Sequence, residues 1–129
     1  GGRSYHHTAP ISMVYALDAG LKEILAEGLE ARWARHARAA NYLRSEMEAF
    51  GFQSLVPEGE RLNPLTTLRL PEGFDEASRR SALLVNHRIE VGAGLGPLAG
   101  KIWRIGLMAN NAQESSIDRL VEALKSELS

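Results

Sequence analysis

Hydrophobic residues recur at steps of three and four along two long stretches near the start of the chain. This is the spacing of one helical face, so the pattern predicts helices over residues 10–26 and 29–50. Pro10 suits the first position of the earlier helix, because its missing N–H would have no partner there. Gly51 is typical of the residue that ends a helix. The apolar stripe of the first helix consists of Ile11, Val14, Leu17, Leu21, Ile24 and Leu25.

The opposite face of the second predicted helix is polar. It carries Arg32, Arg35, Arg38, Arg44 and Glu48. Charged residues at this spacing are typical of a solvated surface, so we expect these side chains to be exposed. Two histidines, His36 and His87, lie within or at the end of predicted helices, and we interpret both as packing residues and not as metal ligands.

The rest of the chain mixes short strand-like runs with further helical spacing. The predicted strands cover residues 66–70, 89–91 and 101–107, and the predicted helices cover residues 75–87 and 114–128. Asp75 is a plausible cap for the first of these helices, because its carboxylate can accept a free backbone N–H. Few strands and several helices predict an α+β fold, in which a small, mostly antiparallel sheet is covered by helices.

Composition narrows the class of protein. The 129 residues include 15 basic and 16 acidic side chains, and this balance argues against a nucleic-acid surface, which needs a basic excess. The absence of cysteine excludes a disulfide framework and a thiol nucleophile. No apolar run approaches the roughly 20 residues that span a bilayer, and the start of the chain lacks the pattern of a signal peptide. We therefore expect a cytoplasmic protein.

Arg104 is the first candidate for a functional role. Side chains alternate along a strand, so Trp103 and Ile105 should face the core while Arg104 faces the other way. An arginine in mid-strand between apolar residues should be partly buried, and a buried guanidinium needs an anionic partner. Its planar fork suits a carboxylate held by two parallel hydrogen bonds. That carboxylate could belong to a ligand or to an Asp or Glu of the chain.

Two further segments carry polar or glycine-rich chemistry. Residues 92–100 contain four glycines, but they lack the spacing of a dinucleotide loop and the ending of a phosphate loop. Tyr5 and Thr8 precede the first helix, where their hydroxyls can donate hydrogen bonds to an anion near its N-terminus. His6 and His7 are adjacent and cannot both point the same way, so we expect no metal site there.

The motifs at residues 4–10 (Ser-Tyr-His-His-Thr-Ala-Pro) and 94–106 (Gly-Leu-Gly-Pro-Leu-Ala-Gly-Lys-Ile-Trp-Arg-Ile-Gly) together resemble a known family. They resemble the C-terminal part of class V, fold-type I aminotransferases that use pyridoxal 5'-phosphate (PLP), in the alanine–glyoxylate and serine–glyoxylate branch. The resemblance implies that Arg104 binds the α-carboxylate of the substrate. It also implies that Tyr5 and Thr8 reach across a homodimer interface to the PLP phosphate of the other subunit.

The resemblance covers essentially the whole chain but only the last third of such an enzyme. It implies that residues 1–26 form a loop and a linking helix, and that residues 27–129 form the small domain. None of Lys22, Lys101 and Lys125 lies in a segment like the family's Schiff-base lysine motif. The large PLP-binding domain is therefore the expected partner, the chain itself carries no catalytic residue, and the chain alone should be inactive.

The implied reaction moves an amino group from a small amino acid, alanine or serine, to glyoxylate or pyruvate. An uncovered large-domain contact should leave an exposed apolar surface along residues 11–25, which favours self-association. The alternative is a non-catalytic α+β module that dimerises or binds partners through its first helix. In that alternative Arg104 is paired with a carboxylate of the chain itself.

Overall fold

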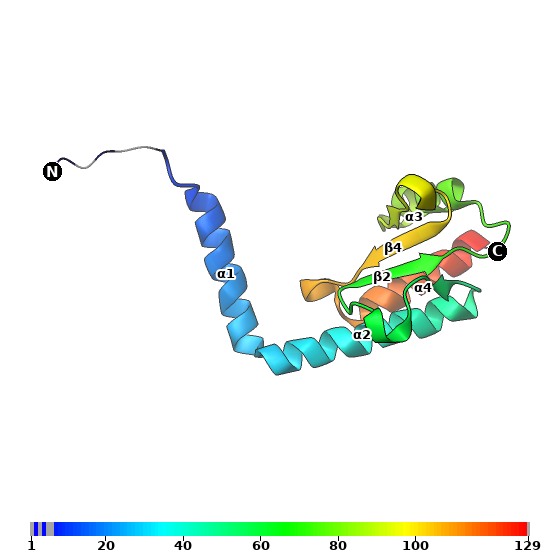
Figure 1. The fold of residues 1–129 in the computed structure, drawn as a ribbon, viewed down its shortest axis with the longest axis horizontal. Coiled ribbons are helices and arrows are strands. Elements are labelled where there is room, and N and C mark those ends of the chain that lie inside the picture. Colours follow the sequence, from blue (N-terminus) through cyan, green and yellow to red (C-terminus); the bar gives the residue numbers. More distant parts are fainter. Residues whose placement is uncertain (1, 3, 5–6, 129) are drawn as a thin grey trace. The chain divides into compact units, whose positions relative to one another are not determined.

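The computed structural model describes residues 2, 4 and 7–128 and divides the chain into two compact units. The N-terminal unit comprises Gly1–Trp33 and the C-terminal unit Ala34–Ser129. Helix α1 (Ile11–Glu27) lies in the first unit, and helix α2 (Leu29–Ala49) begins there and continues into the second (Figure 1). The predicted domain division between residues 26 and 27 stays a prediction.

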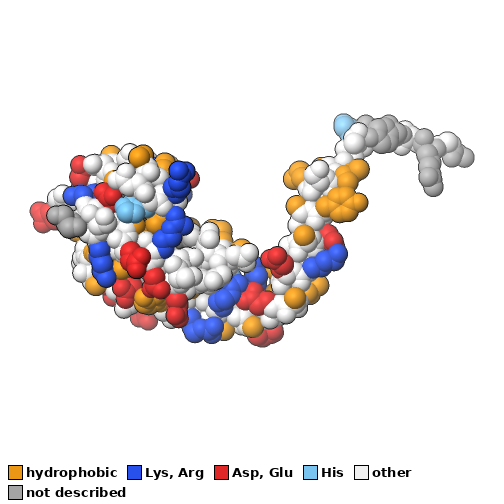
Figure 2. Space-filling model, turned by 180° about the vertical axis from the view of Figure 1, so that it is seen from behind, with side chains coloured by type: hydrophobic (Ala, Val, Ile, Leu, Met, Phe, Trp, Pro, Cys, Tyr) orange, Lys and Arg blue, Asp and Glu red, His pale blue; other side chains and the backbone are white. Residues whose placement is uncertain are grey.

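Helix α1 is exposed along most of its length. It begins after Pro10, whose carbonyl accepts the N–H of Val14 at 3.1 Å, and it ends at Gly28, whose φ is 84°. None of its residues is buried, and the predicted apolar stripe is exposed except at Ile24, which is half-buried; Leu17 is 62% and Leu25 77% exposed. Figure 2 shows hydrophobic side chains distributed along this helix. Most helices are stabilised by burying such a face, so α1 presents an apolar surface that lacks its usual cover.

The C-terminal unit is an antiparallel sheet with the strand order β1-β2-β4-β3 and with helices beside it (Figure 1), which confirms the predicted α+β fold. The strands are β1 (Gln53–Ser54), β2 (Leu65–Arg69), β3 (Gly92–Ala93) and β4 (Ile102–Gly106). Besides α2, the helices are α3 (Glu76–His87) and α4 (Glu114–Leu128), and short 3₁₀ turns lie at Glu58–Glu60, Gly96–Leu98 and Ala109–Asn111.

The core lies between one face of the sheet and helices α2, α3 and α4. Trp103 is fully buried, and the ring centroids of Phe52 and Phe74 lie 5.4 and 5.1 Å from that of Trp103. The indole Nε1 donates a hydrogen bond to Glu76 at 3.1 Å, so the polar atom of the ring is satisfied. The sheet and the three helices add the buried residues Leu43, Met47, Leu68, Leu83, Ile117, Leu120 and Leu124.

Of two local predictions made from the sequence, one is confirmed and one is wrong. Asp75 caps α3 as predicted, because its carboxylate accepts the N–H of Ser78 at 3.2 Å. The predicted strand at residues 89–91 is wrong, and the strand lies at Gly92–Ala93 instead. Gly92 pairs with Arg104 and Ala93 with Trp103. Pairing with β4 therefore determines which residues form the edge strand β3.

The prediction that the arginines of α2 are solvated is wrong for Arg44, which is 8% exposed. The loop between β1 and β2, which includes Arg61, lies over this turn of the helix, together with Thr66 of β2. Arg35 is also partly covered, and its Nη1 donates hydrogen bonds of 2.9 Å to the carbonyls of Ala109 and Ala112. The polar face of α2 therefore includes contacts within the C-terminal unit.

Candidate functional site

Arg104 lies in the middle of β4, on the sheet face that the helices leave open. Its backbone pairs with Thr67 of β2 and with Gly92 of β3, so both neighbouring strands hold it in place. Trp103 and Ile105 point into the core and are buried, whereas Arg104 is half-buried on the other face. The strand therefore places one guanidinium at the centre of the open face, as the alternation predicted.

The guanidinium of Arg104 has a neutral partner. Its Nε donates a hydrogen bond of 2.9 Å to the carbonyl of Ala93. Among the residues that the structure describes, no carboxylate forms an ion pair with Arg104, and its terminal nitrogens make no hydrogen bond. Because a partly buried guanidinium is most stable beside an anion, these terminal nitrogens are suited to an acceptor from outside the chain.

Gly92 makes room for this guanidinium. A Cβ added at Gly92 would lie 3.4 Å from Nη2 of Arg104 and 3.3 Å from its carbonyl oxygen, closer than most such contacts. The glycine spacing of residues 92–100 indicates a loop and gives no sign that Gly92 pairs with Arg104. One feature of the sequence could have indicated this place: Gly92 directly follows a predicted strand, and a glycine in or beside a strand often marks the close approach of another group.

The glycine-rich loop packs closely against the start of β4. A Cβ at Gly94 would meet the backbone carbonyl of Leu98 and would lie 2.8 Å from Cγ1 of Ile102, so no side chain fits there. The Gly94 N–H donates to the carbonyl of Ile102 at 3.2 Å, and the Lys101 N–H donates to the carbonyl of Leu98 at 3.1 Å. The loop therefore folds back onto the strand that carries Arg104.

The predicted phosphate-binding residues lie in the N-terminal unit. Tyr5 lies outside the described residues, so its predicted contact with a phosphate stays a prediction. Thr8 is exposed and precedes the first residue of α1, Ile11. This position is compatible with donating a hydroxyl hydrogen bond near a helix N-terminus, where an anion is favoured.

The lysines do not form a cofactor pocket within the described residues. Lys22 pairs with Asp18 at 2.7 Å on the exposed surface of α1. Lys101 is exposed before β4, and Lys125 is exposed in the last turn of α4. The described residues also hold no cluster of three His, Cys, Asp or Glu side chains suited to a metal ion. None of the described helices combines the length and the apolar character needed to cross a bilayer.

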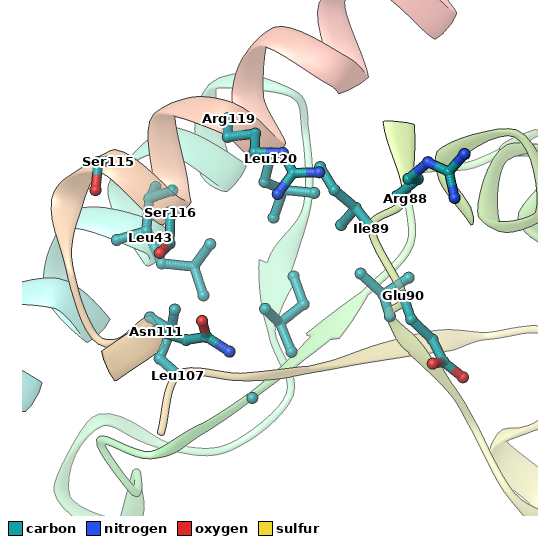
Figure 3. Close-up of a pocket in the computed structure, with 14 residues that line it drawn as sticks. Leu43, Arg88, Ile89, Glu90, Leu107, Asn111, Ser115, Ser116, Arg119 and Leu120 are labelled. Carbon is teal, nitrogen blue, oxygen red and sulfur yellow. The ribbon is translucent and has the colours of Figure 1, made fainter. Parts of the chain in front are cut away.

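A hollow of about 410 Å³ lies at the end of β4, beside the start of α4. Asn111 and Ser116 line one side of it, and Arg119 projects from α4 (Figure 3). Its lining includes neither Arg104 nor a lysine. Nη2 of Arg119 donates to the carbonyl of His87 at 2.6 Å, so this guanidinium helps to hold the end of α3. The hollow is therefore separate from the predicted carboxylate site.

Comparisons with known proteins find relatives that are similar to this chain in sequence and in fold, although no family model matches the chain. Alanine–glyoxylate aminotransferase of Callithrix jacchus is 40% identical over 127 residues, which are 98% of this chain and 31% of that protein. (S)-Ureidoglycine–glyoxylate transaminase of Bacillus subtilis is 36% identical over 115 residues, 89% of this chain and 28% of that protein. The crystal structure of alanine–glyoxylate aminotransferase from Nostoc sp. has a TM-score of 0.93 and 46% identity, covering 98% of this chain and 34% of that one.

The chain thus spans about a third of the length of these relatives. The likeness extends over nearly all of the chain, and it includes the strand that carries Arg104. It also agrees with the small antiparallel sheet and its helices. In sequence and in fold, this chain matches the small C-terminal part of a class V aminotransferase.

Proposed function

We propose that this chain is the substrate-carboxylate-binding part of a PLP-dependent aminotransferase. The complete enzyme moves an amino group from a small amino acid, alanine or serine, to glyoxylate or pyruvate. The two relatives named above share glyoxylate in their names and differ in the amino donor, which supports glyoxylate as the acceptor. The observation that carries the proposal is the Arg104 guanidinium, which is half-buried on the open face and has no carboxylate partner among the described residues.

The role of Arg104 is to bind and orient the substrate. Two parallel hydrogen bonds from its guanidinium hold the α-carboxylate, which fixes the position of the rest of the molecule. PLP supplies the electron sink for amino transfer and needs a lysine, an acidic residue and a ring-stacking group. We assign those three groups to a large domain. We assign to Tyr5 and Thr8 hydrogen bonds to the PLP phosphate of the other subunit in a homodimer.

The exposed helix α1 supports a large domain as the partner. Ile11, Leu17 and Leu25 are at least half exposed, and together they form part of a continuous apolar stripe. Burying such a stripe stabilises an assembly by about 25 cal/mol for each Å² of apolar surface removed from water. We propose that the large domain covers α1, and that the enzyme acts in the cytoplasm, which fits a chain without cysteine.

Substitution of Arg104 in the complete enzyme tests the proposed role. Arg104→Ala should lower kcat/KM for the amino acid by roughly 100-fold or more, because two charge-assisted hydrogen bonds are lost. The matched control is Arg69→Ala, because Arg69 is an exposed arginine on the same open face that pairs with Ile102 of β4. Equal and small effects of both substitutions would contradict carboxylate binding by Arg104.

The chain on its own tests the assignment of PLP to the large domain. We expect no amino transfer when the purified 129-residue chain is mixed with PLP, alanine and glyoxylate. After borohydride reduction, the intact mass and peptide map should show no single labelled lysine. Specific labelling of Lys22, Lys101 or Lys125 would show that the chain holds PLP itself, and the assignment to a large domain would be wrong.

A further inference from the structure

A second arginine, Arg44, is buried and forms no ion pair with any described residue. It lies on α2 and is 8% exposed. Its Nη2 donates a hydrogen bond of 2.8 Å to Oδ1 of Asn41, which is neutral. In the described part of the chain, no carboxylate lies within ion-pair distance of this guanidinium. A buried charge in this position is costly unless something else neutralises it.

A second cation, Arg61, lines the same pocket as Arg44. Arg61 lies in the loop before β2, and its Nε donates a hydrogen bond of 2.9 Å to the carbonyl of Val56. Burial lowers the pKa of the Arg44 guanidinium, and repulsion from Arg61 lowers it further, against smaller opposing effects of Glu48 and Glu58. Glu48 and Glu58 act on Arg44 only from beyond ion-pair distance, so no carboxylate of the described residues pairs with this guanidinium.

Two buried hydroxyl groups nearby have no hydrogen-bond partner in the part of the chain that the structure describes. They are Oγ of Ser54, on β1, and Oγ1 of Thr66, on β2, where Thr66 is 4% exposed. Ser54 pairs with Leu68, and Thr66 lies two residues from Leu68 along the same strand, so both side chains are on the core face of the sheet. Buried hydroxyl groups are nearly always hydrogen-bonded, so each of these two is suited to hydrogen-bond with a small species bound beside it.

The two arginines and the two hydroxyl groups line one small cavity. Its volume is about 20 Å³, and its lining includes Arg44, Arg61, Ser54 and Thr66. A cavity of this size holds about one water molecule or one monatomic ion. A phosphate or a substrate carboxylate does not fit. The occupant must therefore be a single small species that accepts hydrogen bonds from hydroxyl and guanidinium groups.

We propose that this cavity binds one chloride-sized anion between α2 and the edge of the sheet formed by β1 and β2. The hydroxyls of Ser54 and Thr66 donate hydrogen bonds to the anion, and Arg44 and Arg61 provide the positive charge. Water would satisfy the hydroxyl groups but, unlike an anion, would bring no negative charge to the buried Arg44 guanidinium, which Glu48 and Glu58 affect only from beyond ion-pair distance. The proposal does not depend on the role of Arg104, which lies on the opposite face of the sheet.

Crystals of the whole protein soaked in bromide test the site directly. Bromide resembles chloride and scatters anomalously, so a peak should lie within hydrogen-bond distance of Thr66 Oγ1 and of the Arg44 guanidinium. A water molecule at this position, or a carboxylate from another part of the protein, would overturn the proposal. Because this measurement uses the unsubstituted protein, it does not depend on whether a variant folds.

Thermal melting tests whether the anion binds in solution. At constant ionic strength, replacing gluconate by chloride should raise the melting midpoint by about 2–4 °C, and the rise should level off as the site fills. Arg44→Met should abolish this dependence, whereas Arg38→Met, at an exposed position of the same helix, should keep it. Equal melting in both salts would overturn the proposal even if bromide binds in crystals, because binding would then require crystal concentrations.

Discussion

The two faces of the sheet are built from alternate residues of the same strands, yet the surroundings of their side chains differ. On the face that the helices cover, Trp103 is fully buried among aromatic rings and its only polar atom is satisfied within the unit. On the open face, the next residue, Arg104, is half-buried and keeps terminal nitrogens without a partner among the described residues. One strand therefore supports the core with one set of side chains and places a guanidinium on the open face with the other.

This contrast suggests that substitutions on the two faces should affect different properties, folding stability on one face and ligand binding on the other. The covered face is closed by neighbours within the C-terminal unit, so changes there should alter the free energy of unfolding. On the open face, the guanidinium of Arg104 has no carboxylate partner among the described residues, and a partly buried cation is more stable beside an anion. Changes there should alter binding more than folding.

The largest expected difference is between substitutions at two adjacent residues. Trp103→Ala should lower the free energy of unfolding by about 3–5 kcal/mol, because it removes a large ring from a packed core. Arg104→Ala should lower it by about 1 kcal/mol or less, because one hydrogen bond to the Ala93 carbonyl is lost. Urea unfolding of both variants measures the difference, and equal losses would contradict the separation of the two faces.

A smaller difference is expected between two glycines beside β4. Gly94→Ala should lower the free energy of unfolding by about 1–3 kcal/mol, because the added methyl group collides with the Leu98 carbonyl and with Ile102. Gly92→Ala should cost less, because its closest contacts are at 3.3 and 3.4 Å and one is the end of a flexible side chain. Thermal melting compares the two, and a larger loss at Gly92 would contradict this ranking.

The smallest expected effect concerns a contact between two helices of the C-terminal unit. The Tyr42 hydroxyl donates a hydrogen bond of 2.7 Å to Asp118, which together with desolvation raises the pKa of Tyr42 from 10.0 to about 12. The contribution of this bond to stability should be complete below pH 10 and should be lost as the pH rises towards 12. Ultraviolet titration, with Tyr42→Phe to identify the signal, measures this pKa.

Asp118→Asn is the control for that titration. Removing the carboxylate removes both the accepting group and its negative charge, so the pKa of Tyr42 should fall back towards its ordinary value. If Asp118→Asn leaves the titration of Tyr42 unchanged, the hydrogen bond between α2 and α4 is not the cause of the shift.

Much of the fold could be predicted from local patterns. Helices α1, α2 and α4 follow from apolar spacing, Asp75 marks the start of α3, and alternation along β4 separates Trp103 from Arg104. Each of these depends on neighbouring residues in the sequence and on the regular geometry of one element. The same alternation made Arg104 a candidate, while the resemblance implied what it binds.

Only the tertiary structure decided which surfaces are covered. Sequence spacing placed Arg44 on a solvated face, but residues of β1, β2 and the loop between them enclose it. The strand beside Arg104 lies at Gly92–Ala93 because β4 offers pairing partners there, which no local pattern contains. Burial and strand pairing arise from contacts between residues far apart in the chain. The sequence by itself therefore determined the helices, the two longer strands and the alternation of their faces, whereas packing determined the place of β3 and which faces are covered.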